Sequence, residues 1–252
     1  MKDLYLKLYN EMHNKTFRYK GVTVPFGELI HFASMKGKKY SEANVRLMIV
    51  GRAPYGWSKC DCTSEDTFWN SIQETLHDDF EWVVEKDGIL YSRDNLDYSL
   101  YRGCSIWKVG KKIWEKLSDT KLNIEEKWVD YICWSNLFKI APDNSNPTKM
   151  MKNAQFETCC DLLIREIEEY KPTHILFATG YEDWFYDKQN DFSKLFELAD
   201  KSVDDIVERK GIYVCETGVR IPVLVTQRPD SRKKGMTVKK YCNSVVDNFK
   251  NV

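Results

Sequence analysis

Three segments of the chain share one form, an apolar run that passes directly into a polar loop containing proline. They are residues 45–57 (VRLMIVGRAPYGW), 130–142 (DYICWSNLFKIAP) and 221–231 (IPVLVTQRPDS). Each loop carries a polar side chain able to bind a ligand: Arg52, Asn136 and Arg228. The first run is apolar on both faces and too short for a helix, which is typical of a buried parallel strand. Because open α/β sheets bind ligands beyond the carboxyl ends of their strands, we expect the three loops to line one pocket.

The alternation of apolar runs with amphipathic stretches indicates the elements that position these loops. We expect strands at 46–51, 131–136, 174–180 and 223–226, with a hairpin over 205–226 that turns at Thr217-Gly218. Helices are expected at 26–35, 64–76, 106–117, from Asn146-Pro147 to Pro172, and at 238–249. The prediction is a single α/β domain over 1–252: a three-layer α/β/α sandwich with a central, mainly parallel four-stranded sheet. Residues 1–44 form a helical extension in this prediction, and 78–103 form an insertion or long loop.

Composition narrows the class of protein. Lys+Arg and Asp+Glu are both 38 in 252 residues, so the net charge of zero gives no overall sign of a polyanionic partner. The first residues lack the apolar core of a signal peptide, and no apolar run approaches about 18 residues. A cytoplasmic protein without a membrane partner is therefore expected. Aromatic residues reach 13 %, enough to fill a core and leave some rings for stacking on a planar ligand.

Eight cysteines raise the question of a metal or disulfide framework. Most lie within the expected strands and helices, and only Cys60 and Cys62 share a loop. A single Cys-x-Cys pair is a weak metal signal, and the four histidines are scattered. We expect reduced structural thiols, no metal and no cofactor.

Taken in order, the three loops resemble the motifs of the uracil-DNA glycosylase superfamily. The first motif of that family is Gly, a polar residue, Asp or Ala, then Pro, which resembles Gly51-Arg52-Ala53-Pro54-Tyr55. The family's middle strand carries a base-reading Asn and in some branches ends in Thr-Asn, two hydrophobic residues and Lys, which is similar to 135–139 (SNLFK). Its closing His-Pro-Ser motif and basic loop resemble 228–235 (RPDSRKKG).

The resemblance implies a DNA-repair hydrolase that excises uracil or a related deaminated base from single- or double-stranded DNA. Asn136 and Arg228 would be the catalytic residues, with Arg228 holding the negative charge that develops on the departing base. Base-binding residues would be Gly51, Arg52, Ala53, Pro54, Tyr55 and Phe68, and DNA-binding residues would be Ser231, Arg232, Lys233 and Lys234. Arg52 occupies a position where the family has Gln or Glu, and its residue type alone assigns it no role.

Three departures and several simpler interpretations stand beside this hypothesis. The water-activating Asp of the family is Ala53 here, the His is Arg228, and the cluster-binding cysteines are missing, so no iron–sulfur centre is implied. Asp143, Asp230, Glu65 and Asp66 are candidate water activators by loop position only. In the simpler interpretations, Phe68 is a core residue and Arg228 is a surface arginine that contacts phosphate. Asn136 is then a polar residue at a strand end whose amide is hydrogen-bonded by loop backbone. The alternatives are a non-catalytic module that binds a nucleobase or single-stranded nucleic acid, and an α/β protein without a pocket.

Overall fold

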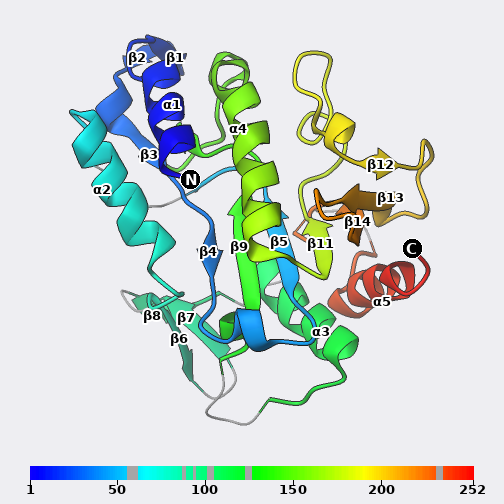
Figure 1. The fold of residues 1–252 in the computed structure, drawn as a ribbon. Coiled ribbons are helices and arrows are strands. Elements are labelled where there is room, and N and C mark those ends of the chain that lie inside the picture. Colours follow the sequence, from blue (N-terminus) through cyan, green and yellow to red (C-terminus); the bar gives the residue numbers. More distant parts are fainter. Residues whose placement is uncertain (56–61, 87–88, 93–94, 101–104, 123–126, 231–234) are drawn as a thin grey trace.

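The computed structural model describes residues 1–55, 62–86, 89–92, 95–100, 105–122, 127–230 and 235–252. The fold is α/β, built on one seven-stranded mixed sheet with helices on both faces (Figure 1). The strand order is β12 (Glu197–Leu198), β13 (Val207–Val214), β14 (Arg220–Thr226), β11 (His174–Phe177), β5 (Leu47–Gly51), β9 (Ile132–Asn136) and β4 (Met35–Lys36). The sheet is therefore larger than the four strands expected from the sequence.

The four adjacent strands β14, β11, β5 and β9 are parallel to one another, and β12, β13 and β4 add antiparallel strands at the two edges. All five residues of β5 are buried, as a strand between two layers of helices requires. The expected hairpin is present: β13 and β14 pair antiparallel, and Gly218 turns between them with a positive φ of 82°.

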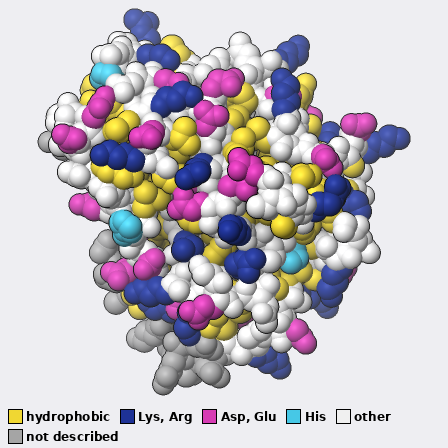
Figure 2. All heavy atoms as spheres, in the orientation of Figure 1, with side chains coloured by type: hydrophobic (Ala, Val, Ile, Leu, Met, Phe, Trp, Pro, Cys, Tyr) yellow, Lys and Arg dark blue, Asp and Glu magenta, His cyan; other side chains and the backbone are white. Residues whose placement is uncertain are grey.

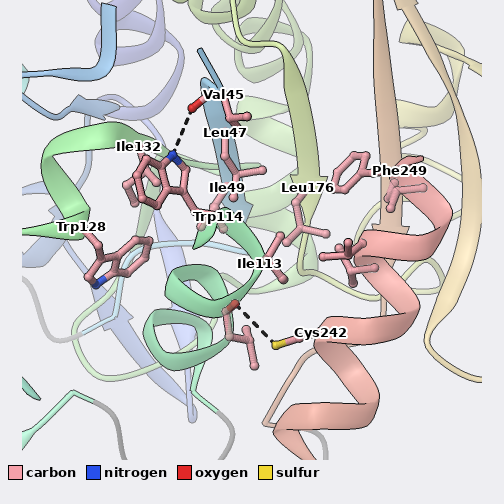
Figure 3. Packing of buried hydrophobic residues seen from close by; sticks show 14 of the residues in the cluster. Val45, Leu47, Ile49, Ile113, Trp114, Trp128, Ile132, Leu176, Cys242 and Phe249 are labelled. Carbon is pink, nitrogen blue, oxygen red and sulfur yellow. Dashed lines mark hydrogen bonds between the residues drawn. The ribbon is translucent and has the colours of Figure 1, made fainter. Parts of the chain in front are cut away.

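Helices cover both faces of this sheet. The 22-residue helix α4 (Lys149–Tyr170) packs on one face, where its buried Cys159, Leu163 and Ile167 meet residues of β5 and β9. On the opposite face lie α3 (Ile106–Ser118) and α5 (Val238–Phe249). Figure 3 shows this second layer, in which Ile113, Trp114 and Phe249 contact Leu47, Ile49 and Leu176 of the strands.

Side-chain caps fix where the helices begin. Helix α2 (Glu65–Leu76) starts after Ser64, whose hydroxyl accepts from the Thr67 amide in a capping box, at the position that the sequence predicts. Helix α4 begins after Thr148, which accepts from the Met151 amide, two residues later than the Asn146 cap that we predicted. Thr148 supplies the same kind of oxygen acceptor, so the sequence offers two competing caps and the chain uses the second.

The N-terminal region differs from the predicted helical extension. Helix α1 (Lys2–Met12) is present, but the helix predicted at 26–35 is wrong: this stretch contains a 3₁₀ turn (Phe26–Glu28), β3 (Leu29–His31) and part of β4. Strand β3 pairs with β10 (Ile140–Pro142), and β4 pairs with β9. Pairing with strands about 100 residues away outweighs the local helical periodicity. A short hairpin, β1 (Phe17–Tyr19) and β2 (Val22–Val24), precedes them.

The segment between α2 and α3, predicted as an insertion or long loop, carries a small antiparallel sheet of its own. Its strands are β6 (Val83–Lys86), β7 (Ile89–Ser92) and β8 (Asn95–Ser99). Buried Phe80 and Val83 at its start join the hydrophobic cluster beneath α3. The insertion is thus anchored to the same core as the central sheet.

The surface is mixed in charge. On the face that carries α4, Lys and Arg side chains alternate with Asp and Glu over most elements (Figure 2). No helix within the described ranges is long and apolar enough to cross a membrane.

Candidate functional site

The carboxyl ends of β5, β9, β11 and β14 meet at one edge of the sheet because these strands are parallel. The first loop leaves β5 at Arg52, the second leaves β9 at Asn136, and the third leaves β14 at Gln227 and Arg228. Residues from all three motif loops therefore lie at the edge where open α/β sheets bind ligands.

Gly51 and Asn136 are direct partners in the register of β5 and β9. The pairing continues beyond the strands, since the Leu137 and Phe138 amides donate to the Gly51 and Arg52 carbonyls at 2.9 and 3.0 Å. A Cβ atom at position 51 would lie 2.4 Å from the Asn136 Oδ1 atom. Glycine is required here by this close approach of the amide side chain to the backbone.

The Asn136 side chain is 2 % exposed, and its Nδ2 atom has no hydrogen-bond partner in the described part of the structure. Leaving a buried donor unpaired costs about 1–3 kcal/mol. Tyr5, Tyr40, Trp128 and Asn190 also carry buried polar atoms with no partner in the described residues, and Asn136 differs from them by its place at the carboxyl end of a parallel strand, where ligands bind. The simpler interpretation expects loop backbone to accept a hydrogen bond from this amide, and for the Nδ2 atom no such bond is present in the described residues.

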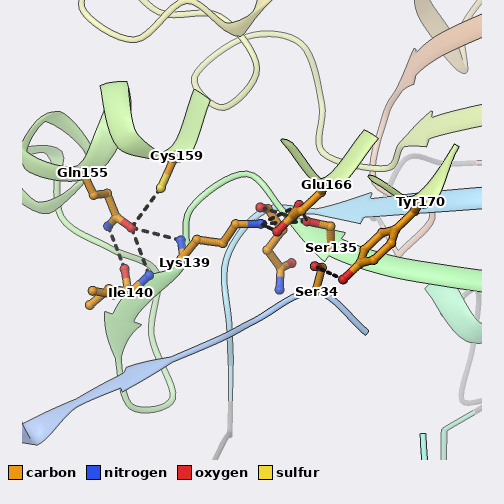
Figure 4. Close-up of polar contacts among 9 residues, drawn as sticks. Ser34, Ser135, Lys139, Ile140, Gln155, Cys159, Glu166 and Tyr170 are labelled. Atoms are coloured by element: carbon orange, nitrogen blue, oxygen red, sulfur yellow. Dashed lines mark hydrogen bonds and ion pairs between the residues drawn. The ribbon is translucent and has the colours of Figure 1, made fainter. Parts of the chain in front are cut away.

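A buried polar network supports the end of β9 on the face of the sheet away from the Asn136 side chain (Figure 4). The Lys139 ammonium lies 2.7 and 3.0 Å from the two Glu166 carboxylate oxygens and 2.8 Å from the Ser135 hydroxyl, which itself donates to Glu166 at 2.6 Å. Lys139 and Glu166 are both fully buried. Because neighbouring residues of a strand point to opposite faces, Ser135 joins this network while Asn136 points away from it.

Gln155 of α4 holds the next residues of the same loop. Its side-chain oxygen accepts from the Lys139 and Ile140 amides at 3.0 and 2.9 Å, and its nitrogen donates to the Ile140 carbonyl at 2.8 Å. Figure 4 shows these contacts beside the lysine network. The loop after β9 is therefore fixed on α4 by side chains, which makes Asn136 a rigidly supported group.

A cleft of about 350 Å³ opens at the ends of β5, β11 and β14. Among its lining residues are Arg52, Gly180, Tyr181, Glu208, Arg228 and Asp230. Two of the three motif loops meet in this cleft, whereas Asn136 is not among its lining residues and lies one strand away, on β9. The prediction of one pocket lined by all three loops is thus met for Arg52 and Arg228 only.

Arg52 is held firmly at the wall of the cleft. Its Nε atom donates to the Thr179 carbonyl, and its guanidinium lies 4.6 Å from the centre of the Trp184 ring. Gly180 has a φ of 81°, and a Cβ there would come within 3.2 Å of the Arg52 guanidinium. Burial, and next the neighbouring positive charge of Arg228, lowers the pKa of Arg52 to about 10, so the group stays charged at neutral pH.

Arg228 is partly exposed and pairs with Asp230, two residues later in the chain. Glu208, which also lines the cleft, accepts from the Tyr181 amide at 2.7 Å and from the Gln227 side chain at 3.4 Å. The cleft is thus lined by two arginines and by carboxylates, of which Glu208 is fixed by hydrogen bonds and favours the charged form of Arg52. Neither Glu208 nor Tyr181 was predicted from the sequence as a site residue. Tyr181 could have been, because it follows a buried parallel strand, and ligands bind beyond the carboxyl ends of such strands.

The remaining predicted base-binding residues occupy varied surroundings. Pro54 is buried, Ala53 packs partly against the cluster beneath α4, and Tyr55 is 66 % exposed. Phe68 is fully buried on α2, with its ring against Tyr9 and Phe26. The faces of Phe68 therefore contact protein, as its interpretation as a core residue requires. The predicted DNA-binding residues Ser231, Arg232, Lys233 and Lys234 lie outside the described residues, as does Trp57 of the first loop.

The candidate carboxylates are scattered. Asp230 lines the cleft, but its carboxylate pairs with Arg228. Glu65 accepts a hydrogen bond from the Asn10 side chain at the start of α2, and Asp66 lies exposed beside it. Asp143 is half-buried after β10. None of these carboxylates is placed beside Ala53 by a contact of the described residues.

Cysteine and histidine chemistry is mostly structural. Cys133, Cys159, Cys160 and Cys215 are buried free thiols, as expected for reduced core residues. Cys62 differs, because it is disulfide-bonded. Within the described ranges, no three His, Cys, Asp or Glu side chains gather as metal ligands would.

Comparison with known proteins adds no further constraint. No protein-family model matches the chain, and no curated protein is similar enough to count as a match.

Proposed function

We propose that the protein recognises a nucleobase flipped out of DNA and excises it, as a slow member of the uracil-DNA glycosylase superfamily. The single observation that carries this proposal is the buried, unpartnered Nδ2 atom of Asn136 at the carboxyl end of β9, held against Gly51. The arrangement of β14, β11, β5 and β9 as adjacent parallel strands supports the proposed glycosylase-like sandwich.

The chemistry of this atom favours a deaminated base. An amide nitrogen donates hydrogen bonds and accepts none, so its missing partner is an acceptor. Uracil, hypoxanthine and xanthine carry a carbonyl oxygen where cytosine, adenine and guanine carry an amino group. An unpartnered donor at Asn136 would therefore bind the deaminated base and leave the amino form with two opposed donors. A base inside the duplex cannot reach such a site, which is why extrusion is part of the proposal.

Departure of the base leaves negative charge on its ring and an oxocarbenium-like sugar. Arg228, on the neighbouring cleft, would stabilise that charge through the field of its guanidinium rather than by contact with the base. Ala53 offers no carboxylate to activate water, so we expect turnover to be slow. Losing a general base costs about 10²–10⁴-fold in rate.

Ala53 also supports a second candidate, a module of the same fold that binds a nucleobase or single-stranded nucleic acid without cleaving it. Both candidates need Asn136, and only the enzyme releases a base. The two are therefore separated by measuring binding and base release on the same oligonucleotides.

The test uses single- and double-stranded DNA with one uracil, hypoxanthine or xanthine, with alkaline cleavage to detect lost bases. Asn136→Asp keeps the side-chain shape but removes the donor, and we expect it to weaken selective binding and excision by about tenfold or more. Asn243→Asp is the matched control, because the side-chain oxygen of this asparagine accepts an exposed contact from Lys116 on the far helices α3 and α5. Folding is checked by the thermal midpoint.

Three outcomes are distinct. Asn136-dependent release of a base supports the enzyme. Asn136-dependent binding without release supports the module. Binding and release that are equal in wild type and a folded Asn136→Asp variant would contradict base recognition by this residue.

A further inference from the structure

Arg52 is built into the cleft in a way that a surface arginine is not. It is fixed by the Thr179 carbonyl, by the face of Trp184 and by the absence of a side chain at Gly180. Lys152 lies 5.1 Å from the centre of the same Trp184 ring and donates to the Asp183 carbonyl at 2.7 Å. The buttressing tryptophan is therefore held in place by a second cation, and the Arg52 guanidinium has little freedom to move away.

Arg228 supplies a second guanidinium to the same cleft. Two like charges on one wall repel each other, and the repulsion is relieved when an anion lies between them. In the structure that anion is internal: the Asp230 carboxylate contacts Arg228 through an ion pair whose side chains are 40 % and 48 % exposed. An exposed pair of this kind is worth about 0–1 kcal/mol, so an external anion can replace it.

We propose that Arg52 and Arg228 form a phosphate subsite for a DNA phosphodiester beside the recognised base, and that Asp230 occupies the phosphate position on Arg228 in the free protein. This inference rests on the proposed function. Phosphate binding gives Arg52 a role that the sequence alone did not assign to it. The planar guanidinium fork matches two phosphate oxygens at once, and a fixed arginine binds with little loss of side-chain entropy.

The acids of the cleft define where the phosphate lies. Glu208 already accepts hydrogen bonds from the Tyr181 amide and the Gln227 side chain. Its negative charge also favours the charged form of Arg52, so it offsets part of that cation and repels an anion from its own position. Glu182 also lines the cleft, and its carboxylate likewise repels an anion. The favourable position is the wall formed by Arg52 and Arg228.

The experiment measures binding of a single-stranded oligonucleotide of abasic residues, which has phosphates but no bases, over a range of salt concentrations. Arg52→Gln and Arg228→Gln should each weaken binding by roughly tenfold or more and lower the salt slope by about 0.7. Arg220→Gln is the control, since Arg220 is an exposed arginine paired with Glu197 on the hairpin; it should change neither quantity.

Asp230→Asn should change binding in the opposite direction to the arginine variants, and it alters an exposed side chain. Removing the internal anion should tighten binding of the abasic strand by severalfold. Glu197→Gln is matched to it, because it releases Arg220 as Asp230→Asn releases Arg228. If the two variants bind equally, or if Arg52→Gln behaves like Arg220→Gln while its thermal midpoint is retained, the subsite is overturned.

Two further arms separate the possible sources of phosphate and the two proposals. Inorganic phosphate and a deoxymononucleotide are added as competitors; displacement by either at micromolar concentration would assign the cleft to a free phosphate compound and overturn its assignment to DNA. Asn136→Asp should bind the abasic strand as wild type does. Loss of base selectivity and loss of the phosphate subsite are thus observed in different variants.

Discussion

At the scale of single residues, Ala53 decides how fast the proposed reaction can be. It follows Arg52 directly in the first loop and is only partly buried, against the cluster beneath α4. In the proposed family this position carries the carboxylate that activates water in some branches. Asn136 can bind a base without it, but the attacking water then has no side chain at position 53 to take its proton.

We expect Ala53→Asp to raise the rate of base release, by up to about 10²–10⁴-fold, because it restores a general base. The measurement is single-turnover release from a uracil-containing strand. Ala53→Asn is the matched control, since it has the same shape without the basic oxygen. Equal rates for the two variants would mean that water is activated elsewhere or that the site is not catalytic.

At the scale of elements, the Lys139–Glu166 pair joins the loop after β9 to α4. Both side chains are fully buried, and Ser135 completes their hydrogen bonds. A buried pair is costly to desolvate and strongly destabilising when one partner is removed. The pair therefore specifies how β9 and α4 fit together more than it adds net stability.

Removing one charge should consequently cost more than removing both. We expect Glu166→Leu to lower the free energy of unfolding by about 3–5 kcal/mol, because Lys139 is left buried without a counter-charge. The double variant Lys139→Met, Glu166→Leu should recover most of that loss. Urea denaturation of the two singles and the double gives the coupling free energy. Losses that add up across the two sites would show that the charges do not depend on each other.

At the scale of the whole molecule, buried histidines link stability to pH. Burial lowers the pKa of His31 to about 4 and also lowers the pKa of His174. The unfolded chain binds a proton near pH 6.5 that the folded protein does not accept until about pH 4. The stability from neutral His31 is thus present above pH 6.5 and is lost as the pH falls through that window.

We expect His31 to account for about 2 kcal/mol of lost stability between pH 7.5 and pH 5. His31→Gln keeps a hydrogen-bonding group toward the Ser71 hydroxyl, which lies 2.8 Å from His31 Nε2, but does not titrate. Its free energy of unfolding should fall less steeply over that range than that of wild type. Parallel curves from urea denaturation at several pH values would contradict the assignment.

The sequence by itself determined the elements whose signals are local. The apolar runs of β5, β9, β11 and β14 are continuous because both faces are buried, and the caps and periodicity of α2, α3 and α5 mark helices that form as expected. It also placed Arg52, Asn136 and Arg228 at or within two residues of the carboxyl ends of those strands, at the edge where parallel strands end. Periodicity misled only where non-local pairing wins, as at β3 and β4.

Only the tertiary structure decided how these residues are combined. Strand order places β11 between β5 and β14, so Gly180 and Tyr181 join Arg52 and Arg228 in the cleft while Asn136 lies beyond β5 on the other side. The packing of α1 and α2 encloses Phe68 in the core. Which side chains become buried, paired or left without a partner depends on contacts between segments far apart in the chain, and local sequence patterns do not encode those contacts.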